Sequence, residues 1–367
     1  MKLQTEKKDF GNIELFVFIY CSTIALGIIF LPYISAEEIR SAWLKVMVGV
    51  IPYLIFLFLL NKVIRKHNDR DVLKVLKDLS FNWLYYPVMI YLLLSTIYSI
   101  FWGIKSLAIV IQTYLLQNTQ QWVVIVTFLI FVGISLMYGI TAITRLIVLM
   151  FICEIGVIAS LVALLFSQDF RWIYIPPVFT VDVFTFLKSS ISETTRYAGL
   201  ITILTFLPLV KKETKIIKTS YMSLLLIMIM FTLVSILTLG TFGFEQTLTL
   251  LSPITALIQT TYAEMTLFER LDLFFLTIWI WALYKAALIY FWFAISITKR
   301  IIPFQKKKEW IPITIYVVII MIVTVATPSF VNLSWEPYNI NLLISTIVLP
   351  ILLFTYMLLR KKRSVKE

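Results

Sequence analysis

A polar run interrupts a long apolar stretch in the second half of the chain. Residues 192–199 read SETTRYAG between apolar neighbours, and Pro208 follows. Such a run is poor material for a continuous helix in lipid, where non-helical backbone is tolerated only if protein or a watery cavity satisfies it. Arg196 in this run is able to pair with a carboxylate. The alternative is a local ion pair with Glu193, three residues away on the same helical face.

The first apolar stretch carries a similar signal. It reads CSTIALGIIFLPY, with Gly27, which permits close approach of another backbone, and Pro32, which lacks a hydrogen-bond donor. A broken helix exposes free N–H groups on one half-helix and free C=O groups on the other. The first attract a carboxylate and the second an ammonium. The two interruptions therefore predict a site for a small zwitterion such as an amino acid.

Two further charges lie inside apolar stretches, Glu154 near the middle of one and Lys285 near the middle of another. A charge at the bilayer centre costs at least about 2.5–3.5 kcal/mol, so it usually faces the bundle interior or a cavity. One interpretation is a structural ion pair that joins two helices. The other is ion or proton coupling, with Lys285 as a fixed cation in place of sodium and Glu154 as a proton carrier.

The sequence contains no constellation that would support catalysis or a bound metal. It lacks the phosphate-binding G-x-x-x-x-G-K-[ST] loop, the G-x-S-x-G nucleophile elbow and the H-E-x-x-H zinc motif. One histidine, His67, and two cysteines, Cys21 and Cys153, cannot build a tetrahedral metal site. We therefore expect no enzyme activity, no metal and no other cofactor.

The elements that position these residues must be helices in a membrane. Hydrophobic residues make up 60 % of the chain and charged residues 14 %, against about 25 % charged in a soluble domain, and the mean hydropathy is +0.93. The apolar runs are long enough to cross a hydrocarbon core of about 30 Å. The sequence predicts an all-α integral membrane protein with ten spans, at residues 13–34, 43–60, 83–116, 122–140, 146–167, 184–210, 220–240, 268–296, 310–327 and 340–359.

The basic residues predict the orientation of these spans. The net charge is +12, and lysine and arginine concentrate on alternate connections, whereas the other connections carry only Arg40 and Arg171. Because cytoplasmic connections are the basic ones, both termini and the basic tail 360–367 are predicted to be cytoplasmic. The charge is thus a signal of topology and of contact with anionic membrane lipids, rather than of nucleic-acid binding.

The span count divides the chain into two halves of opposite topology. Five spans fall in residues 13–167 and five in residues 184–359. An odd number per half is the arithmetic of an inverted repeat, and such folds bind their ligand near the membrane midplane, where discontinuous helices meet. We expect residues 1–367 to form one transmembrane domain, a 5+5 inverted repeat with broken first and sixth helices.

Two polar connections carry structure of their own. Residues 68–80 place apolar side chains among charges in the pattern of a short amphipathic helix on the cytoplasmic surface. The long outer connection 241–267 contains TLTLLSPITALIQ. This run is either a re-entrant or interfacial helix or an ordinary capping loop.

Three motifs resemble a known family. ALGIIFLPY at 25–33, FLPLVKK at 206–212 and especially LFERLDLFFLTIWIWALYKAALIYFWF at 267–293 are similar to the B subunits of endospore nutrient-germinant receptors, within the amino acid/polyamine/organocation superfamily. The resemblance covers nearly the whole chain. It implies a ligand region made of Thr23, Ala25, Leu26, Gly27, Ile28, Glu193, Arg196, Tyr197 and Gly199. The family pattern often has two glycines at the first break where this chain has only Gly27.

The resemblance implies a nutrient-sensing role in the spore inner membrane, together with a larger A subunit and a lipoprotein C subunit. Binding of a nutrient, an amino acid by preference, would trigger germination. The alternative is an amino acid or amine permease, in which the same site alternates its access between the two sides.

Overall fold

The computed structural model describes residues 10–28, 41–175, 182–250, 252–262, 271–302, 309–327 and 335–360, without the side chains of Leu26, residues 258–262, residues 271–276 and Trp335. These residues form helices and connecting loops, with a single isolated β-bridge between Phe10 and Val210. The all-α class predicted from the sequence is confirmed.

The helices of the first half follow the predicted apolar segments closely. They are α1 (Asn12–Ile28), α2 (Ala42–Gly49), α3 (Ile51–His67), α4 (Val72–Leu79), α5 (Asn82–Tyr114), α6 (Gln121–Met137) and α7 (Gly139–Leu164). A bend at Val50 separates α2 from α3, with Pro52 in the first turn of α3, where the missing N–H of proline costs no helical hydrogen bond.

The second half is more interrupted than the first. It comprises the 3₁₀ turn η2 (Trp172–Tyr174), α8 (Val183–Thr194), the 3₁₀ helix η3 (Thr195–Thr202), α9 (Ile203–Phe206), the 3₁₀ turn η4 (Leu207–Leu209), α10 (Ile216–Thr247), α11 (Pro253–Tyr262), α12 (Leu271–Ile301), α13 (Trp310–Ala326), α14 (Trp335–Leu343), the π-helix η7 (Ile344–Val348) and α15 (Leu349–Leu359). Gly243 bends α10 near its end, where it has a positive φ of 72°.

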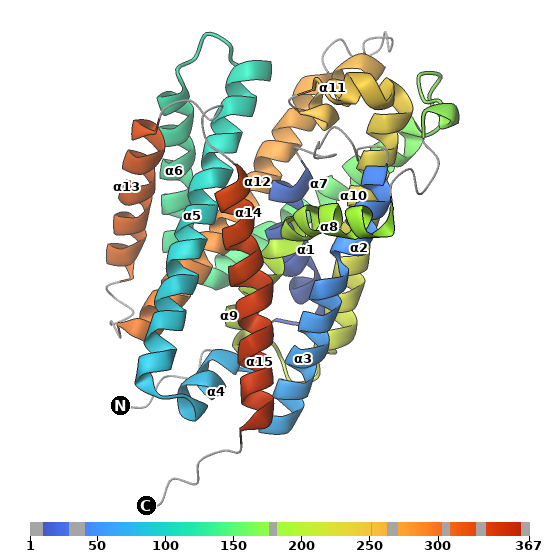
Figure 1. Ribbon diagram of the computed structural model, residues 1–367. Helices are drawn as coiled ribbons and strands as arrows, with labels where there is room; N and C mark the ends of the chain where they lie inside the picture. The colour runs from blue at the N-terminus through green and yellow to red at the C-terminus, as the bar shows by residue number, and fades with distance from the viewer. Residues whose placement is uncertain are drawn as a thin grey trace, which may run out of the picture.

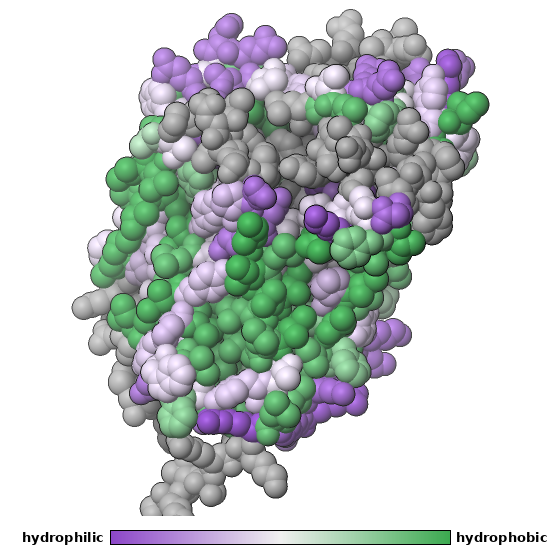
Figure 2. All heavy atoms as spheres, viewed as in Figure 1, coloured by the Kyte–Doolittle hydropathy of each residue, from purple (hydrophilic) through white to green (hydrophobic). Residues whose placement is uncertain are grey.

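Six helical stretches of the described chain are long and apolar enough to cross a membrane. On the face shown in Figure 2, hydrophobic side chains cover the middle of the molecule and hydrophilic ones gather towards its two ends. The chain is therefore a multi-pass membrane protein, while the count of ten spans stays a prediction. The six stretches are Ala42–His67, Asn82–Tyr114, Gly139–Leu164, Ile216–Thr247, Thr277–Ile301 and Glu336–Leu359, and shorter apolar helices lie at Asn12–Ala25, Gln121–Met137 and Trp310–Ala326.

Helix α1 lies at the centre of the bundle, in contact with α7, α10, α12 and η3 (Figure 1). Its Phe18 is fully buried and stacks on Phe206 of α9, with ring centroids 4.0 Å apart, and the edge of Trp292 in α12 completes the cluster. Aromatic pairs of this kind add about 0.5–1.5 kcal/mol to the stabilisation from buried area. The cluster fixes α1 against both α9 and α12.

The amphipathic helix predicted within residues 68–80 is α4, at the lower end of the molecule in Figure 1. The Asp71 carboxylate accepts a hydrogen bond from the Lys74 amide and so caps the helix, and Asp71 also pairs with Arg300 at the end of α12 at 2.9 Å. The apolar side chains of α4 are buried against the protein. Helix α4 thus holds the ends of neighbouring spans together.

The outer connection 241–267 also contains a helix, α11, at the opposite end of the molecule in Figure 1. It packs against α10 and α12, and its own side chains Thr255 and Leu257 are buried. Of the two interpretations of TLTLLSPITALIQ, the helix is the one the structure supports.

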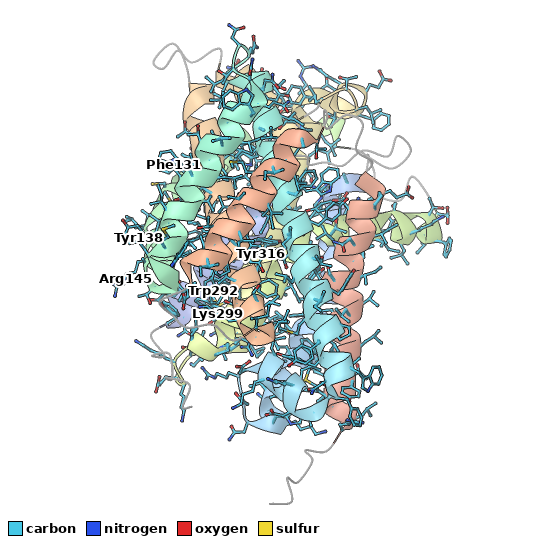
Figure 3. All side chains as sticks on the ribbon, turned by 90° about the vertical axis from the view of Figure 1, so that its left-hand side faces the viewer. Phe131, Tyr138, Arg145, Trp292, Lys299 and Tyr316 are labelled. Carbon is cyan, nitrogen blue, oxygen red and sulfur yellow. The ribbon has the colours of Figure 1, made fainter. Side chains whose placement is uncertain are left out.

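The outer side of α6 and α13 faces away from this core. Figure 3 views the molecule from that side, and Phe131 and Tyr138 lie along its edge, with 59 % and 75 % of their surfaces exposed. By contrast, Tyr316 of α13 is buried, where its hydroxyl hydrogen-bonds Thr298 of α12. This distribution agrees with an apolar surface turned towards lipid.

Candidate functional site

The two predicted helix interruptions have different outcomes. The α-helix of the sixth segment ends at Thr194 and continues in 3₁₀ geometry from Thr195 to Thr202, so the helix changes type within the run 192–199, where the sequence predicted a break. In the first segment, by contrast, α1 is unbroken through Ile28. The chain therefore shows no break as far as Ile28. Pro32 and residues 29–40 lie outside the described part of the chain, so a break in the first segment stays a prediction.

Arg196 joins the end of α1 to η3. Its Nε donates to Oε2 of Glu193, and its Nη1 donates to the backbone carbonyl of Gly27 at 2.7 Å. A guanidinium is a favourable partner for a carbonyl near the C-terminal end of a helix. The side chains of Arg196 and Glu193 are only 9 % and 3 % exposed. We call this contact region, formed by Gly27, Glu193, Arg196, Tyr197 and Gly199, the α1–η3 joint.

The backbones at the joint are in direct contact. A Cβ atom built on Gly199 would lie 2.1 Å from the Ser22 carbonyl oxygen, and one built on Gly27 would lie 2.4 Å from the ring of Phe231. The Tyr197 hydroxyl donates to the Val46 carbonyl at 2.9 Å. The joint is thus closely packed, and only glycine fits at position 199 without backbone displacement.

Thr23 takes part in α1 itself rather than in the joint. Its hydroxyl donates to the Ile19 carbonyl at 2.9 Å, one turn earlier in the helix. Ser22 makes the equivalent hydrogen bond to the same carbonyl. These hydroxyls therefore have local partners in the observed conformation.

Glu154 and Lys285 form the ion pair that was one of the two interpretations of the sequence. Lys285 Nζ of α12 lies 2.5 Å from Glu154 Oε1 of α7, and the two side chains are 0 % and 8 % exposed. Oε1 of Glu154 and Nζ of Lys285 are therefore partners in an ion pair, and Oε2 of Glu154 has no hydrogen-bond partner among the described residues. The pair neutralises two charges that would each be costly in the membrane.

A cavity of about 70 Å³ lies beside this pair, between α1, α7, α10, α11 and α12. We call it the Glu154 cavity. Its walls are mostly apolar, and of the described residues that line it only Glu154 carries a charge. The lining residues are Tyr20, Ile24, Ala25, Ile28, Glu154, Val157, Ile158, Leu161, Met230, Ile254, Thr255, Ile278, Trp279 and Ala282.

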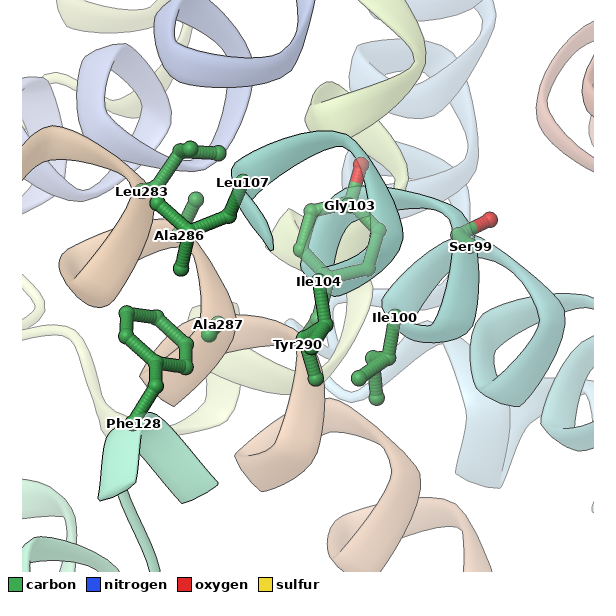
Figure 4. Close-up of a pocket in the computed structure, with 10 residues that line it drawn as sticks. All are labelled: Ser99, Ile100, Gly103, Ile104, Leu107, Phe128, Leu283, Ala286, Ala287 and Tyr290. Atoms are coloured by element: carbon green, nitrogen blue, oxygen red, sulfur yellow. The ribbon is translucent and has the colours of Figure 1, made fainter. Parts of the chain in front are cut away.

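Two smaller cavities lie further along α12. One of about 20 Å³ is lined by α5, α12 and Phe128 of α6, as Figure 4 shows. The other, of about 10 Å³, is lined by hydroxyl-bearing residues of α5 and η7, including Ser95 and Thr346. Ser99 and Tyr290 line both. The smaller one has room for about one water molecule.

The structure separates the residues predicted for ligand binding and for ion or proton coupling. Ala25, Ile28 and Glu154 line the Glu154 cavity, whereas the five residues of the joint line none of the three cavities described above. Thr23 bonds within α1, Lys285 lies behind Glu154 as its partner, and the Leu26 side chain lies outside the described residues.

Sequence reasoning missed Tyr20 and Trp279, which also line the cavity. Trp279 belongs to the aromatic stretch that carried the family resemblance. The sequence gives no sign that it differs from Trp281, two residues on, which is 40 % exposed. Within the described part of the chain, no group of three or more histidine, cysteine or acidic residues is placed to hold a metal ion.

Comparisons with known proteins agree on the class of molecule. A family model described as "Spore germination protein" matches residues 11–331. Spore germination protein A2 of Bacillus subtilis (strain 168) is 23 % identical over 357 residues, which cover 94 % of each chain. The solved structure of a nucleobase-cation-symport-1 family transporter, in a closed conformation with bromovinylhydantoin bound, superposes with a TM-score of 0.60. It covers 98 % of this chain and 93 % of its own at 11 % identity, so that likeness concerns the fold alone.

Proposed function

This chain belongs to the spore germination protein family, and from that premise we propose that it is the nutrient-sensing membrane subunit of a spore germinant receptor. The family and the transporter fold are those of membrane germination and transport proteins, not of enzymes. In this proposal ten spans form a single domain, with inverted repeats at 13–167 and 184–359. Both termini and the tail 360–367 face the cytoplasm, and the chain lies in the spore inner membrane with an A subunit and a lipoprotein C subunit.

The observation that carries the proposal is the contact of Arg196 with both Glu193 and the Gly27 carbonyl. Each group in this contact has a counterpart in a free amino acid. The carboxylate of the nutrient would take Arg196, and its ammonium would take the Gly27 carbonyl and Glu193. Arg196 thus occupies the carbonyl end of α1 until a nutrient competes for it.

This exchange of the partners of Arg196 would couple nutrient binding to a conformational change. In the observed conformation Arg196 ties α1 to η3. A nutrient that binds Arg196 more tightly once this tie is broken stabilises the separated conformation, and only such a difference in affinity shifts the equilibrium. Separation of α1 from η3 at the joint would then be transmitted to the partner subunits.

The test is the germination response of spores whose only copy of this chain carries Arg196→Ala. A charge-assisted hydrogen bond contributes about 1.5–3 kcal/mol, so we expect the amino acid concentration for half-maximal germination to rise by about tenfold or more. Arg145→Ala is the matched control, since Arg145 is exposed on α7. If Arg196→Ala lowers only the amount of protein in the membrane, Arg196 is a structural residue and the proposal fails.

A different measurement distinguishes the permease alternative from the sensing role. It predicts saturable uptake of a labelled amino acid by proteoliposomes that contain this chain without partner subunits. Such uptake would contradict a role limited to sensing. A panel of amino acids and sugars, tested on spores that lack the chain, would identify the nutrient.

A further inference from the structure

The end of α1 opposite the joint is also bonded to the segment that carries η3. Phe10, just before α1, forms the β-bridge with Val210. Its amide donates to the Leu209 carbonyl at 3.4 Å, and its carbonyl accepts a hydrogen bond from the Lys211 amide at 2.8 Å. The Phe10 ring stacks on Phe206, with centroids 5.0 Å apart. Helix α1 is therefore attached at both ends to one continuous stretch of chain, from η3 to the start of α10.

Arg70 supports this attachment from the loop that leads from α3 to α4, the helix at the lower end of Figure 1. Its Nη1 donates to the Val210 carbonyl at 3.1 Å and also to the Lys211 carbonyl. Its Nη2 donates to the Lys212 carbonyl at 2.7 Å. The rigid, planar fork of a guanidinium suits such a set of neighbouring acceptors better than a single donor does. Arg70 thereby fixes the backbone that pairs with Phe10.

The loop that carries Arg70 is itself anchored to the rest of the bundle. Asp71, the next residue, caps α4 and pairs with Arg300 of α12 at 2.9 Å. At the end of α3, Lys66 Nζ donates to the Leu358 carbonyl in the last turn of α15. Arg70 thus joins residues 210–212 to a part of the molecule built from α3, α4, α12 and α15.

The two attachments of α1 bear on the same equilibrium, because α1 is a continuous helix of 17 residues and moves as a unit. In the proposed function, on which this inference rests, the nutrient separates α1 from η3 at the joint. We propose that Arg70 is a positioning residue that opposes this separation by holding Phe10 and Val210 together at the other end of α1. Contacts made in only one of two conformations favour that conformation. Arg70 therefore sets the nutrient concentration at which the joint opens.

The first test is hydrogen–deuterium exchange of the full-length chain in lipid nanodiscs, without any nutrient. Arg70→Gln removes the charge and the fork. The Phe10 and Lys211 amides exchange only when their hydrogen bonds open, so we expect rates about threefold higher there, as for a partly exposed charged contact. A comparable rise is expected in η3, since both ends of α1 share one equilibrium. Arg65→Gln, an exposed arginine of α3, should change neither region. Faster exchange confined to Phe10 and Lys211, or no change in exchange, would overturn the proposal.

The second test is the germination of spores whose only copy of the chain carries Arg70→Gln, with an equimolar mixture of the standard amino acids as the probe. The half-maximal concentration should fall by about threefold, the opposite direction from Arg196→Ala. Damage to the fold would weaken the response, so a lower concentration excludes a merely structural role. An unchanged or higher concentration, with the wild-type amount of protein in the membrane, would contradict the proposal.

Thr219→Val tests the same attachment without a change at Arg70. Thr219 Oγ1 of α10 donates to Asn12 Oδ1 in the first turn of α1 at 3.1 Å. Valine has nearly the shape of threonine but no donor, so a smaller shift of about twofold is expected in the same direction in both tests. If Arg70→Gln does not reach the membrane, this variant decides the question, and an unchanged result rejects the proposal.

The exchange measurement also separates this inference from the proposed function. Arg196→Ala tests the amino acid site, whereas exchange without nutrient reports the attachment alone. If Arg196→Ala leaves the nutrient response unchanged while Arg70→Gln speeds exchange at both ends of α1, the amino acid site at the joint is wrong and the role of Arg70 stands.

Discussion

The α1–η3 joint and the Glu154 cavity both border the last turns of α1, but the bonding of their polar groups differs. At the joint, the Arg196 guanidinium and the Gly27 carbonyl bond to each other. Beside the cavity, Glu154 pairs with Lys285 at 2.5 Å, and the buried Trp279 Nε1 has no hydrogen-bond partner among the described residues. In the proposed function, the joint is a contact that the nutrient must break, whereas the cavity is open space between helices with mostly apolar walls.

This difference follows from how α1 is packed in the two regions. The joint excludes solvent by backbone contact, with the Gly199 Cα facing the Ser22 carbonyl. The cavity exists because the short side chains Ala25 and Ala282 leave room there. Substitutions at the joint should act mainly by disturbing its close packing. Substitutions at the cavity should act by changing the charge balance of Glu154 and Lys285 or the volume of the cavity.

The largest expected effect is at the cavity, from Lys285→Met. Removal of one partner of a buried ion pair leaves the other charge uncompensated, which costs about 3–5 kcal/mol. The double variant Glu154→Leu with Lys285→Met removes both charges and should recover most of that stability. Unfolding in mixed micelles with increasing SDS measures both. A single variant as stable as the double variant would show that Glu154 and Lys285 do not depend on each other.

The next effect is at the joint, from Gly199→Ala. The new methyl group would overlap the backbone of Ser22 and Thr23, and overpacking of this kind costs about 1–3 kcal/mol, occasionally more. Gly156→Ala is the matched control, because a Cβ there would meet no atom within 4 Å and alanine favours a helix interior by about 0.5–1 kcal/mol. Thermal unfolding in nanodiscs should therefore move in opposite directions for the two variants. A destabilised Gly156→Ala would point to a general intolerance of change.

Sequence patterns predicted much of the joint's chemistry and little of its geometry. The run 192–199 predicted a break because polar and small residues cluster there, and the structure has a change from α to 3₁₀ geometry at that place. The spacing of Glu193 and Arg196 allowed their ion pair as one of two alternatives, and that pair is present. The partner of Arg196 in α1 is 169 positions away, and no local pattern reports such a contact. The unbroken course of α1 through Ile28 was also unpredictable from Gly27 alone, since glycine permits a break without requiring one.

The cavity was still less predictable. Hydropathy placed Glu154 and Lys285 inside the bundle, since a charge in a span must avoid lipid, and the structure brings the two together. The cavity walls are ordinary apolar residues that look like lipid-facing ones in sequence. Trp279 and Trp281 are alike in type and two positions apart, and only the three-dimensional packing of α12 separates the one that lines the cavity from the exposed one.

A smaller effect is expected from Gly27→Ala. Its methyl group would meet the end of the Phe231 ring at 2.4 Å, whereas the backbone carbonyl oxygen of Arg196 would lie 3.2 Å away. A ring can shift where a backbone cannot, so the cost should be below that of Gly199→Ala, about 1 kcal/mol. Phe231→Leu in the same chain should relieve it. The half-maximal nutrient concentration should rise in Gly27→Ala spores while the amount of protein in the membrane stays constant. Gly27→Leu, with a bulkier side chain, should abolish the response without loss of membrane insertion.

A normal dose–response in Gly27→Leu spores would exclude the joint as the nutrient site. That result would leave the cavity untouched, because its lining residues Ala25 and Ile28 lie on either side of Gly27 without including it. The two regions would then have to be assigned separate functions.

The smallest effect is expected at the start of α8, the helix that leads into the joint. The exposed Asp182 caps this helix, and hydrogen bonds from the side chain and the amide of Thr185 lower the pKa of its carboxyl. Because that pKa is lowered in the folded state, the cap contributes fully above the unfolded-state value of about 3.9 and is lost as the pH falls below it. Asp182→Asn keeps a good cap that does not titrate. The melting temperatures of the two proteins should therefore agree near neutral pH and separate only below about pH 4, with wild type the less stable. A difference in melting temperature already present at pH 7 would mean that the charge of Asp182, rather than its capping hydrogen bond, stabilises the start of α8.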